Sequence, residues 1–181
     1  MNIFQKRQGQ MDINICYFYT DTIYGFSHLL EDDNLKMVII NSLQYLTTQN
    51  LVTVYGYVIM PNHIHLLWNI FQQNGKESPA GSFAKFTGHQ FKKHLASTNR
   101  SVLNQYKSAK DDRQYQFWKR DPLAIPVSND NILIDKLNYI HSNPIKEKWS
   151  LCKYPEEYKW SSAKFYNTGK DEFGIVTHFR T

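Results

Sequence analysis

The feature that most constrains this chain is the run HIHLLWNI at residues 63–70, in which every second residue from Ile64 onward is large and apolar. Successive side chains of a β-strand point to opposite faces, so residues two apart share a face. The run therefore predicts a strand with one face packed on a core. The other face carries His63 and His65 next to each other, with ring nitrogens able to converge on one point.

The segments on both sides of this run predict the elements that pack with it. Residues 14–20 and 51–60 are rich in β-favouring side chains and predict two further strands. Pro61 and Asn62 interrupt the apolar pattern just before residue 63, so the second and third strands are expected to form a hairpin.

Helical periodicity predicts three helices, at residues 32–49, at 81–97, and from Asn129 or Asp130 to near Asn143. The last one must end there because Pro144 disfavours helical geometry in the residue before it. The side chains expected to face inward are Phe83, Phe86, Phe91 and Leu95 in the second helix, and Leu133, Leu137 and Ile140 in the third.

Two polar regions complete the pattern. Residues 98–116 predict a flexible loop or a frayed extension of the preceding helix, and residues 154–166 predict a loop that leads into a short helix. The order of all these elements indicates an α+β protein in which an antiparallel sheet carries helices packed on it.

Composition sets the class of protein and the compartment. The chain has 181 residues, 41% hydrophobic and 20% charged, which is typical of one globular domain. Two cysteines make a disulfide framework unexpected and suit the cytoplasm, and no apolar run reaches membrane-spanning length. A net charge of +5 permits a polyanionic partner without establishing one.

The histidine pair suggests a metal, since imidazole is the most frequent metal ligand among side chains. An isolated pair of this kind is more often two ordinary surface or core histidines. Two imidazoles also do not complete a site, and no CxxC or HExxH run is present to supply a zinc centre. A third ligand has to come from elsewhere in the chain.

The residues around the pair are more specific than the pair itself. The stretch YVIMPNHIHLLW at residues 57–68 closely resembles the hallmark of the single-tyrosine transposases of the HUH endonuclease superfamily, which include insertion-sequence enzymes and REP-associated relatives. His63, Ile64 and His65 match the family's motif of histidine, bulky hydrophobic residue, histidine. The preceding residues 60–62 match its usual context.

A second match lies downstream, in NYIHSNPI at residues 138–145. It is similar to the family's nucleophile helix, in which a tyrosine is followed four positions later by an amide or similar ligand; here these are Tyr139 and Asn143. Residues four apart on a helix share a face, so the phenol and the amide point the same way. With flanking matches at 117–120 and 155–163, the resemblance spans about residues 14–166.

The resemblance implies a ferredoxin-like fold, with residues 1–181 as one HUH transposase-like domain. It also implies a metal-dependent single-stranded DNA endonuclease and strand transferase that works through a 5′-phosphotyrosine on Tyr139. His63, His65 and Asn143 would hold Mg²⁺ or Mn²⁺, although two nitrogen ligands alone leave zinc open. A DNA hairpin is expected beside the cut strand, and both a monomer and a homodimer remain open.

The phenol of Tyr139 needs help to act at neutral pH, since its ordinary pKa is near 10. The metal is one source and Lys136, one turn earlier, is another; no general base is evident from the sequence. Basic side chains that could track phosphates and one aromatic ring that could stack on bases make up the expected DNA-binding set. They are Lys85, Lys92, Lys93, Trp118, Lys119 and Arg120.

Two rival functions remain from the sequence. One is a domesticated, non-cleaving DNA-binding protein on the same fold, which would tolerate loss of the nucleophile. The other is a metal-dependent hydrolase of small phosphoesters without a covalent intermediate. The presence of His63, His65, Tyr139 and Asn143 together favours catalysis on DNA.

Overall fold

A computed structural model describes residues 10–109 and 113–181, and its centre is a four-stranded antiparallel sheet. The strands are β1 (Ile15–Thr22), β2 (Val52–Met60), β3 (His63–Ile70) and β4 (Leu123–Pro126), in the spatial order β2-β3-β1-β4. β2 and β3 form the expected hairpin, in which Met60 lies opposite His63.

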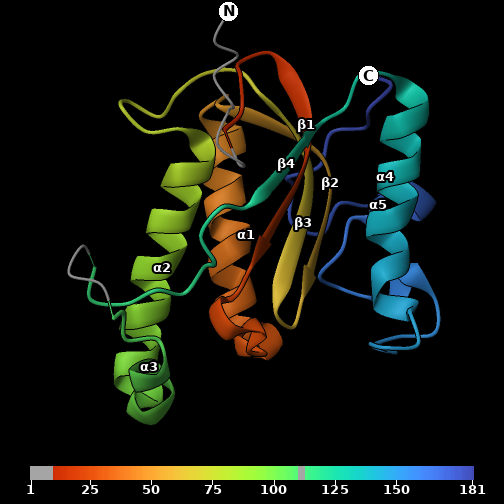
Figure 1. Ribbon diagram of the computed structural model, residues 1–181. Coiled ribbons are helices and arrows are strands. Elements are labelled where there is room, and N and C mark those ends of the chain that lie inside the picture. The colour runs from red at the N-terminus through yellow and green to blue at the C-terminus, as the bar shows by residue number, and fades with distance from the viewer. Residues whose placement is uncertain (1–9, 110–112) are drawn as a thin grey trace, which may run out of the picture.

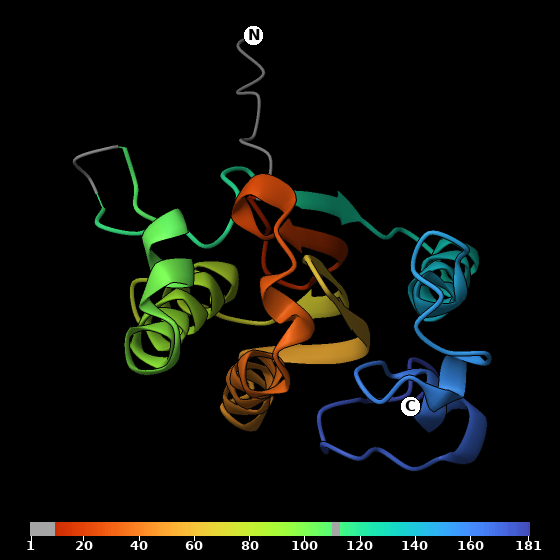
Figure 2. The same cartoon turned by 90° about the horizontal axis from the view of Figure 1, so that it is seen from below.

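Helices cover both faces of this sheet. α1 (Asp33–Thr48) and α2 (Pro79–Thr98) lie on one side, and α4 (Asp130–Ser142) lies on the other, as Figures 1 and 2 show. The chain order β1-α1-β2-β3-α2-β4 with this strand order is the ferredoxin-like arrangement. The expected α+β fold is therefore confirmed.

Shorter helices connect these elements. They are α3 (Arg100–Gln105), α5 (Ala163–Thr168) and the 3-10 turns Tyr24–Phe26, Leu29–Glu31, Asn143–Ile145 and Pro155–Glu157. Across residues 10–109 and 113–181, no helix is long and apolar enough to cross a membrane.

The sheet separates two apolar clusters, as the alternation in β3 predicts. Ile64, Leu66, Trp68 and Ile70 are buried in the larger cluster, on the side of α1 and α2. Leu67 belongs to the smaller cluster, which it forms with side chains of β1, β2 and α4; they are Phe18, Val58, Met60, Leu133, Leu137 and Ile140. The histidine face of β3 is thus the face that α4 covers.

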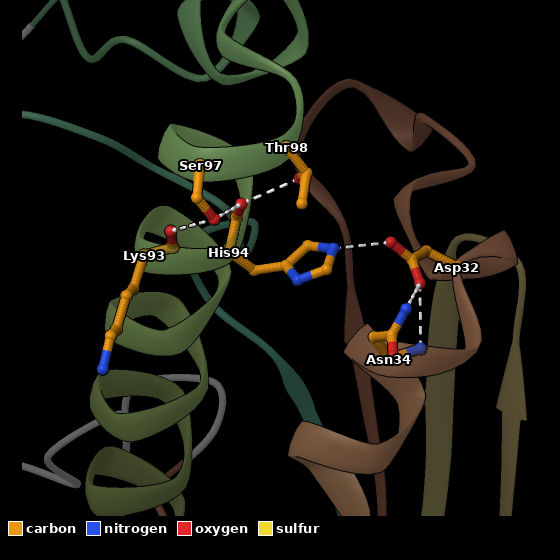
Figure 3. Close-up of polar contacts among 6 residues, drawn as sticks. All are labelled: Asp32, Asn34, Lys93, His94, Ser97 and Thr98. Atoms are coloured by element: carbon orange, nitrogen blue, oxygen red, sulfur yellow. Dashed lines mark hydrogen bonds and ion pairs between the residues drawn. The ribbon is translucent and has the colours of Figure 1, made fainter.

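The helices on the first face are tied together at the start of α1 (Figure 3). The side chain of Asp32 accepts a hydrogen bond from the backbone N–H of Asn34, which caps α1. Its other oxygen lies 2.8 Å from Nε2 of His94 on α2. Lys93, the neighbouring residue on α2, points away from this contact.

Several local predictions need correction. Phe86 does not face inward, since 42% of it is exposed, whereas Phe83, Phe91 and Leu95 are buried. The region 98–116, expected as a flexible loop or a frayed extension of the preceding helix, contains the separate helix α3, which follows α2 directly and has its own cap at Asn99. The strand β4 was not predicted, because its four residues are partly exposed and show no alternation.

Candidate active site

The two histidines lie side by side on β3, with ring centroids 4.8 Å apart and ring planes at 73°. The pairing of β3 with β1 fixes their place, because His65 lies opposite Thr20 and His63 opposite Thr22. The period of two read from the sequence therefore holds, and both imidazoles face the side of the sheet that α4 covers.

Hydrogen bonds orient both rings through Nδ1. Nδ1 of His63 lies 2.7 Å from Oδ1 of Asn62, and the Asn62 amide donates to the carbonyl of Phe26, which fixes its orientation. Nδ1 of His63 therefore carries the proton, and Nε2 keeps its lone pair. Nδ1 of His65 lies 2.7 Å from the hydroxyl oxygen of Thr20.

Nε2 of His65 is the one ring nitrogen of the pair that is buried without a hydrogen-bond partner among the described residues. A buried polar atom left unpaired is costly and calls for an explanation. A metal ion bound at this nitrogen would satisfy it.

Both imidazoles are held neutral. Burial, followed by repulsion from Lys148 and Lys146, lowers the pKa of His63 to about 4. Burial, followed by His63, Lys146 and Lys136, lowers the pKa of His65 to about 3. At neutral pH both rings therefore have a lone pair to offer, which is the form that binds metals.

Tyr139 on α4 lies beside the histidines of its own chain. Its ring centroid is 5.3 Å from that of His65 and 5.8 Å from that of Phe18 on β1, edge-on to both. Phe18 also stacks on His65 at 5.2 Å. The tyrosine is nevertheless 43% exposed, so a large substrate can approach it.

Asn143 follows α4 and is buried, with 3% exposure. Its Nδ2 donates to the carbonyl of Tyr139 at 2.7 Å, which is a contact between positions four apart on one helix face. Its Oδ1 accepts from Nζ of Lys146 at 3.3 Å, and this ammonium also lies 3.9 Å from the Tyr139 ring centroid. The amide oxygen is thus already beside a cation.

The two histidines need the Asn143 amide as a third ligand to hold a divalent ion. Within the described ranges, no group of three or more His, Cys, Asp and Glu side chains is placed to hold a metal. Asn143 is linked to the pair through Tyr139, which it contacts and which lies beside His65. Two imidazole nitrogens and this amide oxygen would form a mixed set suited to divalent metals. The unpaired Nε2 of His65 supports this fit.

The surroundings of the site are basic. Lys136, Lys146 and Lys148 all act on the histidine pKa values, and they would attract a phosphate. Lys146, Lys148 and Trp149, whose ring lies 5.7 Å from that of His63, were not singled out from the sequence. The basic run KEKW directly after Asn143–Ile145 is the signal that points to them.

The expected DNA-binding residues gather mostly elsewhere. Lys85, Lys92, Trp118, Lys119 and Arg120 line a cleft of about 650 Å³ between α2 and the segment 113–122. Lys93 is exposed on α2 but does not line it. Trp118 is only 7% exposed, and its indole N–H donates to the Thr87 hydroxyl at 2.8 Å, so its stacking on a base stays a prediction.

Comparison with known proteins supports the fold. No protein-family model and no curated protein matches the chain. The chain is similar to a solved structure of a REP-associated tyrosine transposase bound to a REP hairpin, with a TM-score of 0.61 and 16% identity, over 99% of this chain and 95% of that chain. The resemblance inferred from the sequence is thereby confirmed at the level of the fold.

Proposed function

We propose that this protein cuts and joins single-stranded DNA with Tyr139 as the nucleophile, as a transposase does. One observation carries the proposal: within one chain, the Tyr139 ring lies 5.3 Å from a histidine whose buried Nε2 has no hydrogen-bond partner in the described part of the chain. A nucleophile and a metal-competent pair in contact are the parts that such a reaction requires.

The reaction begins when the phenolic oxygen of Tyr139 attacks the phosphorus of the scissile phosphodiester. The new bond joins this oxygen to phosphorus, the P–O3′ bond breaks, and a 3′ hydroxyl leaves with the proton that the phenol gives up. The 5′ end stays on the protein as a phosphotyrosine. Because the ester bond is kept, another 3′ hydroxyl can attack it and rejoin DNA without ATP.

His63, His65 and Asn143 would hold the divalent ion, for which we propose Mg²⁺ or Mn²⁺. When bound, the ion supplies Lewis-acid polarisation of the phosphate and lowers the pKa of nearby oxygens. Lys146 contacts Asn143 and the face of Tyr139, so its ammonium is placed to neutralise charge that develops beside the phenol. Burial of the histidines keeps competing protons off both rings.

The DNA partner follows from the basic surroundings and from the neighbour's bound hairpin. We propose a single strand with a hairpin beside it, since lysines surround the site and the long cleft lies on the same domain. Because the tyrosine lies beside the histidines of its own chain, one chain carries all the groups that the reaction uses.

A non-cleaving DNA-binding protein is the second candidate. The contact between Lys146 and Oδ1 of Asn143 favours it, because this ammonium occupies the side of the amide that a metal needs. Cleavage requires that Lys146 releases Oδ1 of Asn143 when the ion binds and keeps its contact with the Tyr139 ring.

A nicking assay on hairpin-flanked oligonucleotides separates the candidates. We expect cleavage that depends on Mg²⁺ or Mn²⁺, that is abolished in Tyr139→Phe, and that is unchanged in Tyr45→Phe, which removes an exposed phenol on α1 across the sheet. A small phosphodiester serves as the second substrate. Turnover of this ester that survives in Tyr139→Phe would instead favour the simple hydrolase.

A further inference from the structure

The cleft between α2 and the segment 113–122 lies on the opposite face of the sheet from the histidines. Tyr19 and Asp21 of β1 line it, while Thr20 between them points the other way and contacts His65. The far wall is fixed to the end of β1, because N–H groups of Tyr24 and Lys119 bond the carbonyls of Phe117 and Thr22, both at 2.7 Å. Backbone hydrogen bonds therefore fix the wall of the cleft relative to the sheet.

The charge and width of the cleft suit a nucleotide. Five basic side chains line it, and Asp21 is the one carboxyl group among its described lining residues; the basic ones are Lys85, Lys92, Arg113, Lys119 and Arg120. Lys85 also forms an ion pair with Glu77 on the rim. Gly81, Ala84 and Gly88 share one face of α2 and leave the inner wall without bulky side chains. Lys92 is held in place by Gln114 at 2.7 Å and by the Tyr115 ring.

Asp21 lies at the floor of the cleft and is only 2% exposed. The Tyr19 hydroxyl donates to its Oδ2 at 3.0 Å, and the backbone N–H of Thr22 donates to its Oδ1 at 2.9 Å. No lysine or arginine of the described residues forms an ion pair with it. Burial raises its pKa to about 7. Above this pKa the group is ionised, and each oxygen keeps a second lone pair for a donor from the cleft.

We infer that this cleft binds an unpaired nucleotide and that Asp21 selects a base with an exocyclic amino group. The amino group donates to the carboxyl of Asp21, while the lysines at the rim hold the adjoining phosphates. Thymine is disfavoured because it has no amino group. The inference rests on the proposed action on DNA and adds to it a specificity residue remote from the cut.

The edge strand β4 lies between the cleft and the helix that carries the tyrosine. Arg120 and Pro122 line the cleft, β4 follows at the edge of the sheet, and α4 with Tyr139 comes next (Figure 1). A DNA strand with one base in the cleft can cross the sheet edge at β4 and reach the histidine face. The selected base would then lie at a fixed distance along the strand from the cleaved bond and help to set the position of cutting.

The test measures binding by the full chain carrying Tyr139→Phe, which cannot cut. Fluorescence anisotropy compares an all-thymine oligonucleotide with versions that contain single cytosine, adenine or guanine substitutions. We expect at least one substituted oligonucleotide to bind about 10-fold more tightly, since a good base contact contributes about 1–3 kcal/mol. Adding Asp21→Ala, which removes both acceptor oxygens, should reduce this preference to less than twofold and leave binding to thymine unchanged.

Asp130→Ala is the matched control, because it removes one exposed carboxylate at the start of α4, outside the cleft. Lack of any base preference in the parent protein, or a preference that survives Asp21→Ala, would overturn the inference. Nicking by the wild-type protein is measured separately. A base preference without nicking would support the inference about the cleft and contradict the proposed function. Nicking without a base preference would support the proposed function and contradict the inference.

Acylation of lysines gives a readout that does not depend on the folding of any variant. Bound oligonucleotide should protect Lys92 and Lys119 in the cleft and leave Lys93 reactive, since Lys93 is exposed on the same helix outside it. Equal protection of Lys92 and Lys93 would place the DNA elsewhere on α2 and contradict the inference.

Discussion

At the scale of single residues, the histidine pair is prepared for a ligand by its neighbours. Asn62 and Thr20 each engage an Nδ1 atom and leave Nε2 facing the site. The nearby lysines and the burial of the rings keep the pair neutral, so no proton has to leave before an ion binds at pH 7. The sequence supplied the spacing of the pair, but Thr20 lies 45 positions away and becomes its neighbour only through strand pairing.

Metal binding by the pair is testable without activity. Mn²⁺ at about 100 times its Kd should stabilise the wild-type fold by about 2.7 kcal/mol, measured as a shift in denaturant unfolding. His65→Ala should abolish this stabilisation, because it removes the unpaired Nε2. His89→Ala, an exposed histidine on α2, is the control and should keep it. Full stabilisation of His65→Ala by Mn²⁺ would place the ion elsewhere.

At the scale of elements, the packing of α4 on β2 sets the distance between Tyr139 and the histidines. Gly56 lies at an irregularity of β2, where a Cβ would be only 2.5 Å from Cδ1 of Leu137. The absence of a side chain at this position lets α4 lie directly on the strand. Sequence periodicity predicts that Leu137 faces inward, but it does not show which residue it meets.

Gly56→Ala should lower the free energy of unfolding by about 1–2 kcal/mol, because the added methyl group overpacks a buried contact. It should also reduce nicking more than the loss of stability accounts for, since the added methyl group would push α4, and Tyr139 with it, away from β3. Gly88→Ala is the control for stability alone, because Gly88 lines the cleft: its Cβ would meet Phe117 at 3.8 Å, an ordinary contact, and alanine favours a helix. Unchanged stability and nicking in Gly56→Ala would refute this account of the packing.

The elements that the sequence predicted best are those with strong periodicity. β3 and α4 have clear patterns, and Asn129 caps the start of α4 as expected. α4 ends at Ser142, but Asn143 keeps helical dihedrals and a 3-10 turn runs through Pro144, so the expectation that the proline excludes helical geometry at Asn143 is wrong. β4 is held by backbone pairing to β1, which no local pattern reveals. The cleft was missed because its floor, Asp21, and its wall, residues 113–122, are brought together only by the fold.

At the scale of the whole molecule, buried titratable groups lie on both sides of the sheet. Their shifted pKa values make the stability of the fold depend on pH. Burial lowers the pKa of His141 to about 4, so three histidines stay neutral in the fold but bind protons near pH 6.5 when unfolded. The free energy of unfolding therefore decreases as the pH falls from about 6.5 towards 4, because the unfolded state binds protons that the folded state does not. Asp21 acts oppositely, because its raised pKa lets the folded state bind a proton first.

The net effect of three histidines against one aspartate is that the metal-free protein loses stability in acid. Each net proton contributes about 1.4 kcal/mol per pH unit. Urea unfolding at pH 7 and pH 5 should therefore show a clear loss at pH 5, and Asp21→Asn, which removes the opposing group, should make the loss steeper. Constant or rising stability towards pH 5 would contradict the neutral state of the buried histidines.

The most direct test of the central claim is to isolate the covalent intermediate. The protein is incubated with Mn²⁺ and a single-stranded oligonucleotide that carries a hairpin, then denatured, digested with protease and analysed by mass spectrometry. The account predicts one modified peptide, in which the 5′ phosphate of the cut strand is joined to Tyr139. A cut strand with no adduct, or an adduct on any other residue, would contradict it.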